Sequence, residues 1–237
     1  MIAATHDRGL PPQPVASGWH TTLLITLFLA LAVAGALFQR QAVSRSGAPS
    51  HPDVVPLYLS LLVAEWGLFL YVRKGALRQT GTTLGELIGG QWRGPQDVLV
   101  DAGLALGVWA VWRILDAGWE RWLGPGHAAS IQPFLPRRAV EILLWIALSI
   151  SAGICEELAF RGYLQRQFAA LTHRPWLGVG LQAALFGIAH GYQGIQASLK
   201  IAVYGALFGL LALWRRSLRP GMIAHASTDL QAALFGI

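Results

Sequence analysis

Two adjacent carboxylates, Glu156 and Glu157, stand at the end of an apolar run, and an arginine, Arg161, follows them. Ionisable residues inside a membrane helix are costly, so they require a partner, a water-filled cavity or a function. On a helix, Glu157 and Arg161 are four residues apart and share a face, which allows them to pair. Glu156 points about 100° away and has no local partner. Glu156 is therefore the first candidate for chemistry.

Three further polar residues interrupt apolar runs later in the chain. His190 ends the run that begins at Leu185, and His225 and Asp229 lie in the segment Met222–Asp229. The spacing of four puts His225 and Asp229 on one helix face, where Asp229 can orient the imidazole. Because intramembrane ionisable groups usually face an interior cavity, we expect these residues to form one site with Glu156.

The residue types at this site favour water as the nucleophile, since no serine or cysteine stands in a nucleophile motif. A glutamate in an apolar cavity suits a general base, His190 can help to hold the water, and His225 can polarise a carbonyl or stabilise its oxyanion. The same groups can also bind a metal, since two histidines and a carboxylate leave an open zinc position. We expect no cofactor to be required. Zinc on His190, His225 and Glu156 is the alternative that the sequence leaves open.

The composition indicates a membrane protein. Of 237 residues, 54% are hydrophobic and 13% are charged, whereas a soluble domain carries about 25% charged residues. The net charge of +6 comes from short basic clusters between apolar runs, as in membrane-protein loops, and not from one basic patch. We therefore expect a lipid bilayer and no nucleic acid as a partner. The only cysteine, Cys155, excludes an intramolecular disulfide and is expected to pack as a small residue.

The apolar runs predict an all-α, polytopic transmembrane helix bundle of about seven spans, within a range of six to eight. The expected helices cover residues 21–38, 54–72, 98–115, 138–168, 176–190, 195–214 and 221–235. The fourth is too long for one span, so it either extends beyond the membrane or bends near Gly153. Residues 80–96 are expected to form a loop, or a loop with one short helical turn from Thr83, and residues 116–123 an interfacial segment.

The amino-terminal region divides into two parts. Residues 1–20 are expected to form a flexible tail, and residues 21–237 a transmembrane domain with the polar motifs in 140–230. The sequence around 34–36 is similar to a signal-peptidase site, yet the long proline-rich tail favours a retained first helix over a cleaved signal. The lysine and arginine distribution predicts a cytoplasmic amino terminus.

The remaining ionisable residues of the apolar runs are expected to lie outside the site. Glu65, Asp101 and Glu141 are lone carboxylates near span ends, where solvated or structural roles suffice. Lys200 is expected to extend its ammonium group to an interface.

The three polar motifs together resemble the CPBP family of intramembrane proteases, which includes CAAX-processing endopeptidases and Abi-like bacteriocin-processing proteins. The family pattern is Glu-Glu-x-x-x-Arg, then Phe-x-x-x-His, then His-x-x-x-Asn/Asp. Here it reads Glu156-Glu157-Leu-Ala-Phe-Arg161, Phe186-Gly-Ile-Ala-His190 and His225-Ala-Ser-Thr-Asp229. The resemblance covers about residues 140–230. The first half of the chain matches only as generic membrane helices.

The resemblance implies an endopeptidase of a bacterial plasma membrane that cleaves membrane-associated or C-terminal peptide substrates. Glu156 would activate water with help from His190, and His225 with Asp229 would form the oxyanion hole. Asp229 departs from asparagine, and an ionised aspartate cannot donate a hydrogen bond to an oxyanion. Asp229 is then protonated, orients His225 or helps to bind a metal. Glu157, Arg161 and Phe186 would be structural.

Two rival functions use the same fold. A non-catalytic scaffold or bacteriocin-immunity protein would bind a partner without needing Glu156, and an ion or proton-coupled transporter would use the carboxylates as a relay. The complete motifs favour the enzyme, with a cavity expected to open to the cytoplasm.

The expected helix boundaries leave one geometric problem. Glu156 would lie about 18 Å from Phe168, His190 about 20 Å from Leu177, and His225 only about 8 Å from Pro220. The last helix must begin deeper than its neighbours, or tilt, for these groups to meet.

Overall fold

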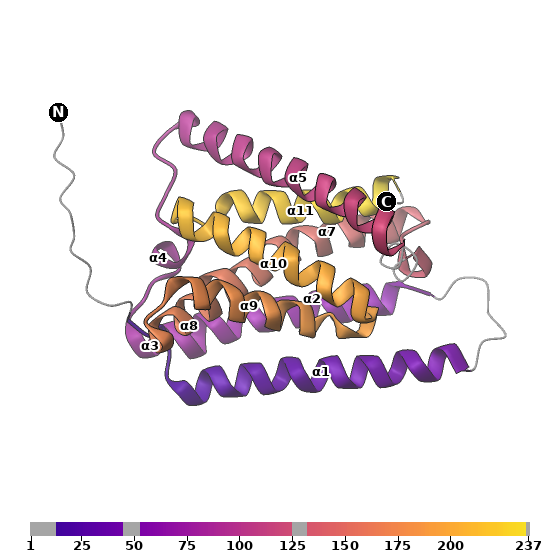
Figure 1. Cartoon of the computed structure of the whole chain (residues 1–237), viewed down its shortest axis with the longest axis horizontal. Coiled ribbons are helices and arrows are strands. Elements are labelled where there is room, and N and C mark those ends of the chain that lie inside the picture. Colours follow the sequence, from indigo (N-terminus) through magenta and orange to yellow (C-terminus); the bar gives the residue numbers. More distant parts are fainter. Residues whose placement is uncertain (1–12, 45–52, 125–131, 236–237) are drawn as a thin grey trace.

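The computed structural model describes residues 13–44, 53–124 and 132–235, and within them every regular element is a helix. The long helices run roughly along one axis and form a bundle (Figure 1). The α-helices are α1 Gly18–Ser44, α2 Val55–Leu70, α3 Leu77–Thr80, α4 Leu84–Ile88, α5 Pro95–Leu123, α7 Ala139–Glu156, α8 Gln165–Thr172, α9 Pro175–Ala189, α10 Ile195–Arg215 and α11 Arg219–Phe235. The π-helical segments are η1 Tyr71–Ala76 and η3 Glu157–Leu164, and the 3₁₀ turns are η2 Gln132–Phe134 and η4 Gly191–Gln193.

The bundle has two ends, which we name by the termini of the described chain. The amino end is where α1, α5, α9 and α11 begin, and the carboxyl end is where α2, α7 and α10 begin and α11 stops (Figure 1). The all-helical membrane bundle predicted from the sequence is thereby confirmed. Among the described residues, five segments are long and apolar enough to cross a membrane: Gly18–Gly35, Val55–Thr80, Pro95–Trp122, Ala139–Thr172 and Ile195–Arg215. α9 is a shorter apolar helix, and α11, which carries His225 and Asp229, completes the bundle.

The long fourth segment is helical from Ala139 to Thr172, as α7, η3 and α8 in succession, and no break in the helix falls at Gly153. Instead, the absence of a side chain at Gly153 lets α11 pack closely against α7. A Cβ at this position would lie 2.9 Å from the backbone nitrogen of Ala226 and 2.9 Å from the backbone oxygen of Met222. The irregularity comes at Glu157, where the helix widens into the π-helical segment η3. Such π turns are frequent at functional sites because they re-aim the side chains that they carry.

The short helix α4 closes the amino end of the bundle. Its cap residue Thr83 accepts from the backbone N–H of Glu86, whose carboxylate accepts from the backbone N–H of Thr83 at 2.7 Å. These hydrogen bonds hold the pKa of the Glu86 carboxyl below its usual value. Leu87 is completely buried, and the carbonyl of Ile88 accepts from the backbone N–H of Leu218 at 2.9 Å. α11 therefore begins beside the end of α4.

The amino-terminal segment is anchored to the bundle from Val15 onward. The backbone N–H groups of Val15 and Ala16 both donate to Oε1 of Gln167, at 2.9 and 3.2 Å. α1 then begins at Gly18, and the Thr21 hydroxyl lies 2.8 Å from that of Tyr163. Residues 1–12 of the expected tail lie outside the described residues. The first helix is therefore an integral part of the bundle.

α5 extends further than the sequence predicted. The helix continues from Pro95 to Leu123, so residues 116–123 are its last two turns and not a separate interfacial segment. Lys200 of α10 is buried, with 3% of its surface exposed, and forms an ion pair with Asp116 of α5 beside the ring of Trp112. The expectation that Lys200 reaches an interface is therefore wrong, since Asp116 compensates the buried ammonium group.

Two of the three lone carboxylates have structural partners, as expected. Asp101 is fully buried and accepts from Arg215 at 3.0 Å and from the Trp92 indole at 2.8 Å. Glu141 caps the start of α7, where it accepts from Arg138 at 2.7 Å. The third, Glu65, lies on α2 and contacts Glu156.

Candidate active site

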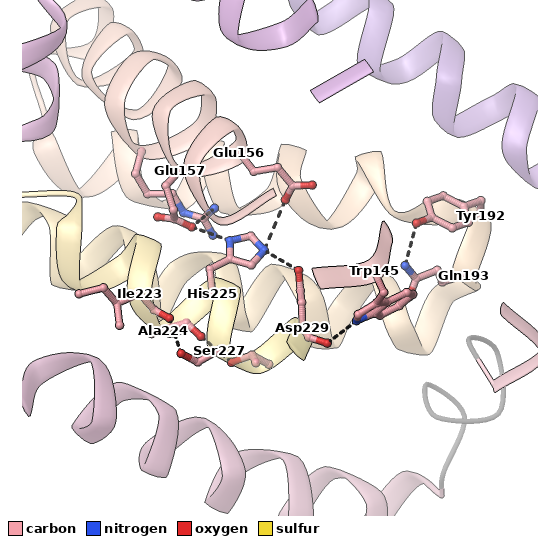
Figure 2. Close-up of polar contacts among 12 residues, drawn as sticks. Trp145, Glu156, Glu157, Tyr192, Gln193, Ile223, Ala224, His225, Ser227 and Asp229 are labelled. Carbon is pink, nitrogen blue, oxygen red and sulfur yellow. Dashed lines mark hydrogen bonds and ion pairs between the residues drawn. The ribbon is translucent and has the colours of Figure 1, made fainter. Parts of the chain in front are cut away.

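Three helical segments bring the predicted residues together in the middle of the bundle. The junction of α7 and η3 carries Glu156 and Glu157, and η3 also carries Arg161. α11 packs along α7 and supplies His225 and Asp229, while α9 supplies Phe186 and His190. Figure 2 shows Glu157, His225, Glu156 and Asp229 in one chain of polar contacts.

Glu157 stands at the buried side of this chain of contacts. Its Oε1 lies 2.9 Å from Nη1 of Arg161 and 3.0 Å from Nδ1 of His225, and its side chain is 1% exposed. A Cβ at Gly221, in the first turn of α11, would lie 3.0 Å from Oε2 of Glu157. The carboxylate thus lies against a helix start, whose positive dipole favours a negative charge. The ion pair with Arg161 was predicted, whereas the contact with His225 was not.

The contact with Glu157 determines how His225 is oriented. Since a carboxylate only accepts, Nδ1 of His225 carries the proton that it donates to Glu157. Nε2 then faces the other way, 3.7 Å from Oε2 of Glu156 and 3.8 Å from Oδ2 of Asp229. Glu157, and not Asp229 as the sequence suggested, is the group that fixes the ring of His225.

Arg161 is held among aromatic rings as well as by Glu157. Its guanidinium carbon lies 4.3 Å from the centre of the Phe186 ring and 5.6 Å from that of Phe208. The ring of Phe208 also lies 6.0 Å from His225. Cation–π contacts of this kind stabilise a desolvated charge.

His190 lies beside this group without a direct polar contact to it among the described residues. Its Nδ1 is 2.8 Å from the carbonyl oxygen of Phe186, so Nδ1 donates and the neutral ring keeps Nε2 as an acceptor. The His190 ring is 4.8 Å from the Phe186 ring, which in turn lies 6.1 Å from His225. Phe186 is therefore the packing link between the two histidines.

Comparison with known proteins gives one finding for this segment. Residues 138–231 match the family model described as type II CAAX prenyl endopeptidase Rce1-like. Residues 138–231 are therefore similar to this family and are called the Rce1-like segment below. The resemblance inferred from the three motifs is thereby confirmed, and the matched family is a family of proteases. The match begins at the start of α7 and includes all three motifs. Neither the curated proteins nor the solved structures gave a match.

One residue outside the Rce1-like segment joins the site and was not predicted to do so. Glu65 of α2 lies within hydrogen-bonding contact of Glu156. The sequence analysis assigned it a solvated or structural role, as a lone carboxylate near a span end. A lone carboxylate in an otherwise uncharged helix was the signal that favoured a functional position.

The geometry does not fit a metal centre in the described part of the chain. There, no group of three or more histidine, cysteine, aspartate or glutamate side chains is arranged to hold a metal ion. His225 is turned by Glu157, and His190 contacts neither Glu156 nor His225.

Proposed function

We propose that this protein is an intramembrane endopeptidase that hydrolyses peptide bonds with a water molecule activated by Glu156. The observation that carries the proposal is the position of Glu156 beside Nε2 of His225, at 3.7 Å, while Glu157 holds the opposite ring nitrogen. A base and a hydrogen-bond donor close to each other are the two groups that water attack on a carbonyl requires. The substrate is a peptide or protein segment. A prenylated substrate follows from the family's description alone.

The first step couples proton removal to attack. Glu156 accepts one proton from water while the water oxygen forms a bond to the carbonyl carbon, and the carbonyl electrons move onto the oxygen. Nε2–H of a doubly protonated His225 donates to that oxyanion, because Nδ1–H is already directed at Glu157. The second step breaks the carbon–nitrogen bond, and the departing amine takes the proton from Glu156.

His190 and Asp229 have supporting roles in this mechanism. His190 presents an unprotonated Nε2 as an acceptor for the same water, since its Nδ1 donates to Phe186. Asp229 lies 3.8 Å from Nε2 of His225 and favours the cationic ring. Asp229, which stands where asparagine would donate directly, therefore stabilises the oxyanion indirectly, through the cationic ring of His225.

Cleavage of a quenched peptide library by the purified protein in detergent tests the proposed function, with and without a chelator. We expect cleavage that survives chelation and yields the two peptide fragments with one water incorporated. Loss of cleavage after chelation, restored by zinc, would contradict the glutamate-activated water. No cleavage of any peptide would favour the non-catalytic scaffold.

The side of the membrane from which the substrate reaches the site can also be proposed. Exposure of the side chains rises along the site from 1% at Glu157 through 15% at Glu156 to 35% at Asp229, in the direction of the carboxyl end. Tyr192 and Gln193 of η4 lie beyond Asp229 in the same direction (Figure 2). In the opposite direction α4 and its buried Leu87 close the bundle.

The charge distribution relates these ends to the two sides of the membrane. Basic residues of the described chain are more numerous at the amino end than at the carboxyl end. The amino end carries Arg73, Lys74, Arg78, Arg93, Arg166, Arg174, Arg215, Arg216 and Arg219, and the carboxyl end carries Arg40, Arg113, Arg121, Arg137, Arg138 and Lys200. By the positive-inside rule the amino end is cytoplasmic, so the exposed side of the site faces outward. We therefore propose access from the outer face, in contrast to the cytoplasmic opening expected from the sequence.

Labelling of single cysteines in intact cells checks this orientation. The native Cys155 is completely buried, so the unsubstituted protein serves as the unlabelled control. We expect Tyr192→Cys, at the carboxyl end, to react with a membrane-impermeant maleimide in intact cells. Arg174→Cys, an exposed position at the amino end, should react only after permeabilisation. The reverse pattern would place the opening on the cytoplasmic side.

A further inference from the structure

α2 presents one face to the rest of the bundle, and Glu65 lies on that face. The inward residues recur at alternating spacings of four and three, as expected of a helix packed along one stripe. They are Tyr58, Leu62, Glu65, Phe69 and Val72, all buried or half-buried, whereas Leu59, Leu61, Val63, Trp66 and Leu70 are exposed. Glu65 is the only charged residue of α2. A carboxyl group at this place is costly unless it has a task or a partner.

Contacts on either side of Glu65 fix α2 against α7. The Trp66 indole donates to the Ser151 hydroxyl at 3.2 Å, and the Tyr58 ring meets the Trp145 ring edge-on with 5.4 Å between centres. These contacts bring the carboxyl group of Glu65 within hydrogen-bonding contact of Glu156, the last residue of α7. The proximity is therefore built by the packing of two long helices.

Each of the two carboxyl groups has an oxygen that requires a hydrogen-bond donor. Oε2 of Glu65 and Oε2 of Glu156 are both buried and have no hydrogen-bond partner among the described residues. Two ionised carboxylates offer only acceptors, so they cannot satisfy each other. One proton held between them gives the donor that the pair lacks.

The surroundings indicate which group carries that proton. Glu156 lies 3.7 Å from Nε2 of His225, which is the cationic group of the proposed mechanism. Glu65 has no ion pair with lysine, arginine or histidine among the residues that the structure describes. A protonated Glu65 is a donor, and an ionised Glu156 is the acceptor that a general base must be.

We infer that Glu65 is a positioning residue, which donates a hydrogen bond to Glu156 and aims its second carboxylate oxygen at the catalytic water. The inference rests on the proposed function, because the orientation of Glu156 affects cleavage only if Glu156 is the general base. It extends the active site beyond the Rce1-like segment, residues 138–231, to a helix of the first half of the chain. The role assigned to Glu65 requires a donor at this position and no negative charge.

The test compares three variants by steady-state peptide cleavage in detergent. Glu65→Leu removes the donor, and we expect kcat to fall on the order of 10- to 100-fold with KM unchanged, because the base is misaimed while the substrate still binds. Glu65→Gln keeps an N–H donor at the same reach and should restore kcat to within a few-fold of the wild type. Leu62→Ala, one turn away on the same face, loosens the α2–α7 packing and should leave kcat unchanged.

The outcomes separate this inference from the proposed function. Wild-type cleavage together with full activity of Glu65→Leu would overturn the role of Glu65 and leave Glu156 as the base. Equal losses in Glu65→Leu and Glu65→Gln would also overturn the donor role. If the wild type cleaves no peptide, infrared spectroscopy still decides, because the protonated carboxyl stretch should be present in the wild type and weaker in Glu65→Leu. The same spectrum in both proteins would refute the donor.

Discussion

Glu156→Gln is expected to reduce peptide cleavage at least about 100-fold, since a general base typically contributes a factor of 10² to 10⁴. The amide has the shape of the carboxylate and its carbonyl still accepts a hydrogen bond, but it cannot take a proton from water. The stability of the protein should change little or rise, because the amide carbonyl still accepts the hydrogen bond proposed from Glu65 and no buried charge remains at this position. The measurement is kcat for one cleaved peptide beside the thermal midpoint in the same detergent.

A matched control makes the result specific to the site. Glu120→Gln carries the same chemical change on α5, where the side chain is 41% exposed and 3.9 Å from Lys200. This variant should cleave as the wild type does. Cleavage by Glu156→Gln at a wild-type rate would remove Glu156 from the mechanism and, with it, the reason for placing Glu65 in the site.

The site could be predicted from sequence to the extent that local spacing determines it. Glu157 and Arg161 pair because four residues on a helix bring side chains together, and His225 and Asp229 share a face for the same reason. The convergence of α7 and α11 followed from the expectation that costly polar groups meet in the interior.

The contacts that sequence analysis missed are between helices distant in the chain. His225 is oriented by Glu157, 68 residues away, because the π-helical turn at Glu157 and the small residue Gly221 bring the two together. Glu65 meets Glu156 only through the packing of α2 on α7. Spacing along one helix carries no information on which neighbour its polar face will meet.

The sequence predicted the boundaries of the helices more completely than the depth at which each helix lies in the bundle. The starts and ends of α9 and α10 agree within one residue with the expected ranges, since proline, glycine and arginine mark them in the sequence. The level at which α11 begins depends on the hydrogen bond from Leu218 to Ile88 of α4. That bond joins the end of α4 to the turn before α11, which are far apart in sequence, and neither has a pattern that predicts it.

Arg161→Met is expected to lower the free energy of unfolding by about 3–5 kcal/mol, the range found when one partner of a buried ion pair is removed. Arg161 is 0% exposed and pairs with Glu157, which is 1% exposed, at 2.9 Å. Methionine keeps much of the volume between Phe186 and Phe208, so the loss comes from the carboxylate that remains buried, with His225 as its only partner among the described residues. Denaturant titration in detergent, followed by circular dichroism, measures the change.

The double variant Glu157→Gln/Arg161→Met distinguishes an uncompensated charge from a lost contact. Removing both charges should recover most of the stability, because replacing a buried ion pair by neutral groups is often close to neutral. Its cleavage rate should nevertheless stay low, since a glutamine at 157 holds the ring of His225 without favouring its cationic form. Arg138→Met is the control at an arginine that is 61% exposed, and it should change stability little, because its partner Glu141 still accepts from the backbone N–H groups of Arg137 and of residue 138. If the double variant is as unstable as Arg161→Met alone, the guanidinium stabilises the fold through its aromatic neighbours, and the pairing with Glu157 serves the site and not the stability of the bundle.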